Sequence, residues 1–369
     1  MALHAVGNID DAIDATKAFV LPFELRRWLK LAFVVFFLGG GGGTGGIQNI
    51  GNLGNIGDGG GPGGPGGGAT GGFSLTAPVE MLPALSDVLF QVPGPDVPAD
   101  PSGALGGLGV AVVAIAVVVI LVIALVFAVV GAVMEFVFTT SLITQEVHVR
   151  RSFREHLGDG LRLLGFRIVL GILGLLVFGS ILLGLFVLIV GADLANLGTS
   201  AMLGSIGLVV VVIAAAALVL GTVSGFTNVF VVPLMVQGDE GVLAGWGRLW
   251  SSITAEPKQY LAYLFLSVVL GIGVGIVGAV LGAIAFVVLA IPFGIVGALF
   301  WFALGEGLAS GVLVGIVALL FVLALLVVAN LIKAPLQSFL RYYAMLVLGD
   351  IDADLDPIPE VRASIRDEA

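Results

Sequence analysis

Residues 108–133 read LGVAVVAIAVVVILVIALVFAVVGAV, and this stretch contains no charged side chain. An α-helix rises about 1.5 Å per residue, and roughly 20 apolar residues therefore cross the hydrocarbon core of a bilayer. Further uncharged, mostly apolar runs of spanning length follow at 168–190, 203–223, 261–291 and 312–329. We therefore predict an all-α, polytopic membrane protein with about six transmembrane helices, of which the first is a weaker segment near the N-terminus.

The composition excludes several other classes of protein. Of the 369 residues, 59% are hydrophobic and 11% are charged, whereas a soluble domain carries about 25% charged residues. Cysteine is absent, which excludes disulfides and thiolate metal sites. The net charge of −10 comes from 25 acidic and 15 basic residues, whereas nucleic-acid binding favours a basic surface. We expect no nucleic-acid partner.

The basic residues predict the orientation in the membrane. All 15 Lys and Arg residues fall in four groups, which alternate with three connections that contain none. Because Lys and Arg mark the cytoplasmic side, we expect a multi-pass protein of the cell membrane with both termini in the cytoplasm. We expect residues 1–38 to form an N-terminal interfacial helix and the first span, and residues 39–104 to form an extracellular loop that is Gly-rich and largely disordered to about 72. Residues 105–350 should form the helical membrane domain, with spans at about 105–145, 164–190, 203–236, 259–291 and 309–348. Residues 351–369 should form an acidic cytoplasmic tail.

Two segments allow alternative interpretations. The first span, 22–38, crosses only if Arg26, Arg27 and Lys30 snorkel at the inner face, and a signal peptide is the alternative. The apolar segment 293–304 follows Pro292 and is interrupted by glycines, so we interpret it as an outer hairpin or as the splayed end of span five.

Three copies of one unit explain several recurring patterns. Amphipathic stretches near 9–20, 153–164 and 242–253 precede the odd-numbered spans and are typical of helices at a membrane interface. Asn lies five residues before Pro in two even spans, as Asn228–Pro233 and Asn330–Pro335. We predict three repeated hairpin units, and the alternative is that apolar hairpins resemble each other by composition alone.

Four features carry a resemblance to a known family. They are the opening run 4–19 with its three Asp residues, the RRWLKL stretch at 26–31, the Gly-rich loop, and the tail at 342–356. Together they resemble an uncharacterised family of haloarchaeal multi-pass membrane proteins. More distantly, residues 226–267 are similar to the membrane domain attached to some glycerophosphodiester phosphodiesterases. Neither resemblance implies an activity here, because the soluble phosphodiesterase domain is missing and the first family has no assigned chemistry.

A search for catalytic or metal-binding residues gives no candidate. His148 and His156 are eight residues apart, which is not the spacing of a helical zinc pair. Ser252 and Ser338 lack recognisable His and acidic partners. The alternating acids at 350–356 lack the Gly and distal Glu of a calcium loop, so we expect a solvated tail. We predict no enzyme activity, no cofactor and no metal.

Polar side chains inside the apolar runs are the candidate functional residues. Glu135, Asn228, Asn330 and Lys333 form this candidate intramembrane polar cluster, because such groups are costly in a membrane. We predict an ion pair between Glu135 and Lys333, from the depths at which they lie in spans two and six. The alternative is that all four lie near the inner interface, where water reaches them.

Two classes of function remain. The first is a non-enzymatic membrane scaffold or accessory protein that binds membrane lipids and a protein partner or a second copy of itself. The second is a transporter or lipid-handling protein built from internal repeats. A polar cavity at the centre of the membrane domain would favour the second class.

Overall fold

The computed structural model describes residues 4–21, 23–40, 104–191, 199–305 and 307–367, and every regular element within these ranges is a helix. The Gly-rich loop at 39–104 falls almost wholly outside the described residues, so its disorder stays a prediction.

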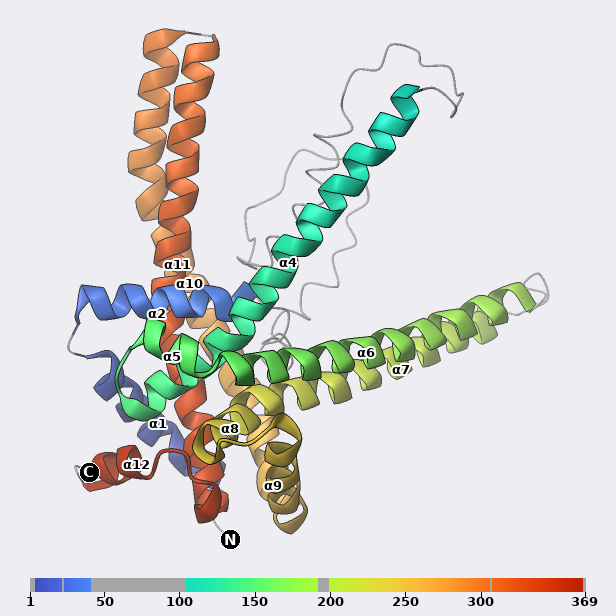
Figure 1. Cartoon of the computed structure of the whole chain (residues 1–369), viewed down its shortest axis with the longest axis vertical. Helices are drawn as coiled ribbons and strands as arrows, with labels where there is room; N and C mark the ends of the chain where they lie inside the picture. The colour runs from blue at the N-terminus through green and yellow to red at the C-terminus, as the bar shows by residue number, and fades with distance from the viewer. Residues whose placement is uncertain (1–3, 22, 41–103, 192–198, 306, 368–369) are drawn as a thin grey trace.

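Three arms of long helices diverge from a common base (Figure 1). The arms are α4 (Ala104–Thr144), the pair α6 (Leu157–Gly191) and α7 (Thr199–Phe226), and the pair α10 (Pro257–Leu304) and α11 (Leu308–Ile351). Among the described residues, five helical segments are long and apolar enough to cross a membrane: Val112–Thr144, Leu157–Gly184, Gly207–Gly238, Pro257–Leu304 and Leu308–Ile351. This confirms the predicted all-α polytopic class.

The predicted first span lies in α2 (Leu25–Gly40), which differs from the arms. Its 16 residues are shorter than a bilayer core of about 30 Å requires, and it packs against α4 and α11. Arg27 and Lys30 donate to the carbonyls of Gln145 and Val147, at 3.0 and 3.2 Å. Both hydrogen bonds join α2 to the chain that follows the C-terminal end of α4, where positive charge is favourable. The snorkelling of these two side chains at the inner face stays a prediction.

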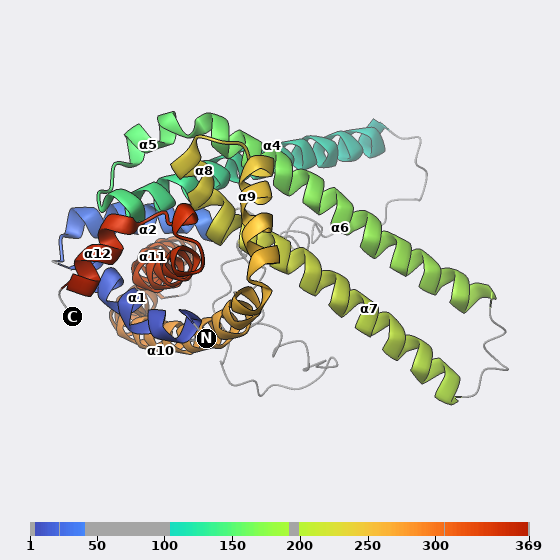
Figure 2. The ribbon, with the colours of Figure 1, turned by 90° about the horizontal axis from the view of Figure 1, so that it is seen from below.

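The hydrophobic core lies in the base, where short elements surround the end of α11 (Figure 2). Residues 342–348 of α11 are at most 1% exposed. The surrounding elements are α1 (His4–Val20), α5 (Val149–Glu155), the π-helix η2 (Thr227–Val231), α8 (Val232–Gly238), α9 (Val242–Ala255), the 3-10 helix η3 (Ala353–Leu355) and α12 (Pro359–Asp367).

Two predicted segments have a different form in the structure. Helix α10 continues through Pro292 to Leu304, so the outer hairpin at 293–304 is wrong and this segment is the end of span five. The chain turns instead at Gly305, whose φ of 68° suits glycine. The predicted interfacial helix at 153–164 is two helices, since α5 ends before His156 and α6 begins after it.

Candidate functional site

A buried group of charged and amide side chains joins the three arms. Glu135 of α4, Arg167 of α6, Asn228 of η2 and Arg341 of α11 form this group, which we call the junction cluster. Nη2 of Arg341 forms an ion pair with one carboxylate oxygen of Glu135, and Nη2 of Arg167 lies 3.4 Å from the other. The side chain of Glu135 is 0% exposed, that of Arg341 4% and that of Arg167 12%. Each arm therefore contributes at least one residue to one buried site.

Asn228 enters the junction cluster because of a local change in helix type. In η2 the N–H of Val232 donates to the carbonyl of Thr227, five residues earlier. The next donor in that pattern would come from position 233, which is a proline and has no N–H. Nη1 of Arg341 donates to the Asn228 carbonyl instead, and Nη2 of Arg167 donates to its Oδ1 at 2.7 Å. Single π turns of this kind occur frequently at functional sites.

The structure brings together only part of the predicted polar cluster. Glu135 and Asn228 lie in the junction cluster, but Lys333 forms no ion pair with any described residue. The predicted Glu135–Lys333 pair is therefore wrong, and Arg341 stands in place of Lys333. The prediction compared the depths of two residues in the membrane and took their helices as neighbours along their length. Helices α4 and α11 instead diverge from the base, and Glu135 and Arg341 meet in the C-terminal parts of the two helices (Figure 1).

Asn330 also lies outside the junction cluster. It is 4% exposed, and its Nδ2 donates to the carbonyl of Leu326 in its own helix at 2.8 Å. Helix α11 remains α-helical through Pro335, whereas the matching stretch before Pro233 forms the π-helix. Equal Asn–Pro spacing therefore gives two different local structures, and the predicted threefold repeat stays a prediction.

Sequence reasoning missed both arginines of the junction cluster. Arg167 directly precedes the apolar run 168–190, and Arg341 lies among apolar and aromatic residues in α11. In the sequence, both arginines indicate only the cytoplasmic side. A charge inside a buried stretch signals a functional group in its own right, and that signal was available for Arg341.

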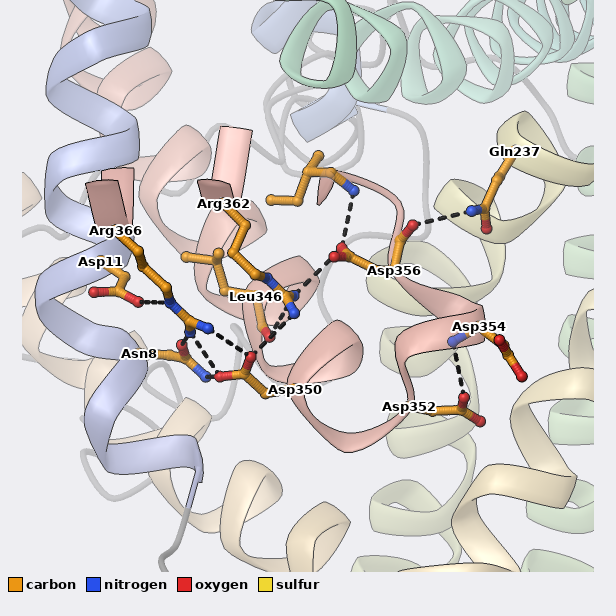
Figure 3. A network of polar contacts seen from close by, with 11 residues as sticks. Asn8, Asp11, Gln237, Leu346, Asp350, Asp352, Asp354, Asp356, Arg362 and Arg366 are labelled. Carbon is orange, nitrogen blue, oxygen red and sulfur yellow. Dashed lines mark hydrogen bonds and ion pairs between the residues drawn. The ribbon is translucent and has the colours of Figure 1, made fainter. Parts of the chain in front are cut away.

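A second polar network ties the two ends of the chain together (Figure 3). Arg366 donates to Asp11 at 2.9 Å, to Asn8 at 3.0 Å and to the two carboxylate oxygens of Asp350 at 3.1 and 2.8 Å. Arg362 donates to Asp350 at 3.0 Å and to Asp356 at 3.3 Å. We call these six residues the terminal clamp, since they join α1, the end of α11 and α12.

The terminal clamp corrects the prediction of a solvated acidic tail at two of its four acids, Asp350 and Asp356. Asp350 and Asp356 pair with arginines, and Oδ1 of Asp352 accepts the N–H of Asp354 at 3.1 Å. Hydrogen bonding to Asp350 raises the pKa of Arg366 above its ordinary value, which keeps this guanidinium charged. Within the described chain, no three His, Asp or Glu residues gather as metal ligands.

Fold and site together define a polytopic helical membrane protein whose arms meet at a buried charge cluster. Residues 3–358 match a family of unknown function, DUF7544, and the chain belongs to that family. No curated protein and no solved structure matches it.

Proposed function

We propose that this protein is a non-enzymatic membrane scaffold, whose base holds three apolar arms at fixed angles. The junction cluster is the observation that carries the proposal, because it draws ionic or amide groups from all three arms into one buried site. Both oxygens of Glu135 already face arginines, which leaves this carboxylate poorly placed for acid–base catalysis. The partners in this proposal are membrane lipids together with a protein partner or a second copy of the chain.

The proposal includes six crossings of the cell membrane with both termini in the cytoplasm. Asn8 contacts Asp350 and Arg366, so both ends of the chain lie on the same side of the arms. Helix α4 begins at the far end of its arm, which requires the chain to reach that side between residues 20 and 104 (Figure 1). The bias in basic residues favours the cytoplasm for the base.

Labelling of introduced cysteines tests this orientation. Ser251 is exposed at the base and Leu308 is 89% exposed at the tip of the third arm. An impermeant thiol reagent applied to intact cells should label Leu308→Cys and not Ser251→Cys. Labelling of Ser251→Cys alone would reverse the proposed topology.

Distances between the arms test the scaffold itself. Val187→Cys and Leu308→Cys, at exposed positions of the second and third arms, can carry a pair of spin labels. A scaffold predicts one narrow distance distribution in lipid, which Glu135→Gln broadens and Lys333→Met leaves unchanged. Two exchanging populations in the unmodified background would contradict a scaffold and indicate the alternating motion of a transporter.

Lipid handling is the second candidate function. An apolar pocket of about 500 Å³ lies between the outer halves of α10 and α11, and its aromatic lining is Phe286, Phe293, Trp301, Phe302 and Phe321. This alternative predicts that vesicles containing the protein transfer fluorescent phospholipid faster than empty vesicles. Gly297→Phe, which would fill the pocket, should then abolish the difference. Equal rates in the two kinds of vesicle would exclude this alternative. The resemblances to haloarchaeal proteins and to the phosphodiesterase membrane domain stay predictions and support neither function.

A further inference from the structure

The junction cluster contains more positive than negative charge. Two guanidinium groups, of Arg167 and Arg341, surround the single carboxylate of Glu135. The two oxygen atoms that Asn228 presents to the arginines are neutral. A buried charge is stable only when it is paired and its hydrogen-bonding groups are satisfied. The cluster as described therefore carries one positive charge in excess.

Each arginine of the junction cluster also has an unused donor. Nε of Arg167 and Nε of Arg341 are buried, and no described residue accepts a hydrogen bond from either. In a guanidinium group the Nε–H lies on the same edge as Nη2, and these two form the fork that binds carboxylates. Nη2 of both arginines contacts Glu135, whereas the Nε–H beside each Nη2 has no acceptor among the described residues.

Thr139 supplies a third buried donor, on the face of α4 that carries Glu135. It lies one helical turn after Glu135 on the same face of α4 and is 1% exposed. The buried hydroxyls of Ser141, Thr227 and Ser338 each donate to the carbonyl four residues earlier in their own helix. The hydroxyl of Thr139 has no hydrogen-bond partner among the described residues, although the same local acceptor position exists for it.

We propose that the junction cluster binds one small monovalent anion of the size of chloride. Nε of Arg167, Nε of Arg341 and Oγ1 of Thr139 are its donors, and its charge balances the excess of the two arginines over Glu135. Arg341 is 3% exposed and Thr139 is 1% exposed, and this burial favours a small ion over a lipid phosphate. An anion that binds only the folded base stabilises it by mass action.

Thermal unfolding of the purified full-length protein tests the site through its anion dependence. Sodium chloride should raise the midpoint temperature of unfolding above that in sodium gluconate at equal ionic strength. This rise should reach a limit as the chloride concentration increases. Thr139→Val keeps the shape of the side chain and removes the donor, and it should raise the chloride concentration for half the gain about tenfold. Ser141→Ala is the matched control on the same helix and should leave that concentration unchanged.

A direct binding measurement on the unmodified protein keeps the test independent of any variant. Radioactive chloride should bind in a ratio of one per chain, and bromide should compete while gluconate should not. Equal midpoints in the two salts, a salt dependence that Thr139→Val leaves unaltered, or the absence of saturable chloride binding would each overturn the proposal.

Discussion

The stretches 112–126 and 132–138 of α4 are both largely apolar but have opposite surroundings. Val112 and Val126 are 65% and 53% exposed, whereas residues 132–138 are at most 4% exposed. Hydropathy does not distinguish a helix surface that faces lipid from one that packs against protein, since both are apolar. The buried end differs by Glu135 and by a close helix crossing, so specific contacts rather than hydrophobicity separate the base from the arms.

Glycines mark the same difference between base and arms. A Cβ on Gly160 of α6 would lie 2.9 Å from the Cα of Val133 in α4, and one on Gly245 of α9 would lie 2.9 Å from Val231. The arm glycine Gly171, in the same helix as Gly160, has open space around it. Small residues let helix backbones approach closely, and here the close approaches lie in the base.

The largest expected effect comes from removing the only negative charge of the junction cluster. Glu135→Gln leaves two buried guanidinium groups without a counter-charge and should reduce the free energy of unfolding by about 3–5 kcal/mol. Lys333→Met, which removes a cation that pairs with no described residue, should change it by less than about 1 kcal/mol. Denaturant unfolding in detergent measures both. Equal losses of unfolding free energy in the two variants would mean that the junction cluster contributes no more to stability than Lys333 does.

A smaller loss of unfolding free energy is expected from substitutions where the helices of the base cross. Gly160→Ala places a methyl group against the backbone of Val133 and should cost about 1–3 kcal/mol of unfolding free energy. Gly171→Ala is the matched change in the arm and should have no destabilising effect, because nothing lies within 4 Å of the new Cβ. The same unfolding measurement applies. If Gly171→Ala proved the more harmful change, close packing would lie in the arms instead.

The smallest effect is expected in the terminal clamp, whose central arginine is partly exposed. Arg366→Gln loses its ion pairs with Asp11 and Asp350, and solvent screening limits the cost to about 1 kcal/mol. Hydrogen exchange should become faster in α1 and α12 while the arms keep their rates. Arg162→Gln, which breaks a pair with Asp159 outside the clamp, is the control. Unchanged exchange in α1 would contradict a role for the terminal clamp in holding the chain ends.

Local sequence patterns predicted the class of fold and most of the long helices. Long uncharged runs identify the arms because a bilayer imposes length and apolarity on each spanning helix. The period of the stripe at 242–253 likewise predicted α9, which begins at Val242. Glu135 and Asn228 were found because a polar group within an apolar run is conspicuous.

The features that the sequence did not predict depend on contacts between segments far apart in the chain. Arg341 and Glu135 are separated by most of the chain, and no local spacing shows that they meet. The return of α12 onto α1 depends on six residues from both ends of the sequence. The comparison of depths that selected Lys333 failed because it assumed parallel neighbouring helices, whereas the arms diverge (Figure 1).

The central claim is that Glu135 and Arg341 connect the first and third arms directly, and a double-mutant cycle measures that connection. The change in unfolding free energy for Glu135→Gln with Arg341→Met should differ from the sum of the single changes by about 1–3 kcal/mol. The parallel cycle of Glu135→Gln with Lys333→Met should be additive within about 0.5 kcal/mol. Additive losses in the first cycle and coupling in the second would contradict the account.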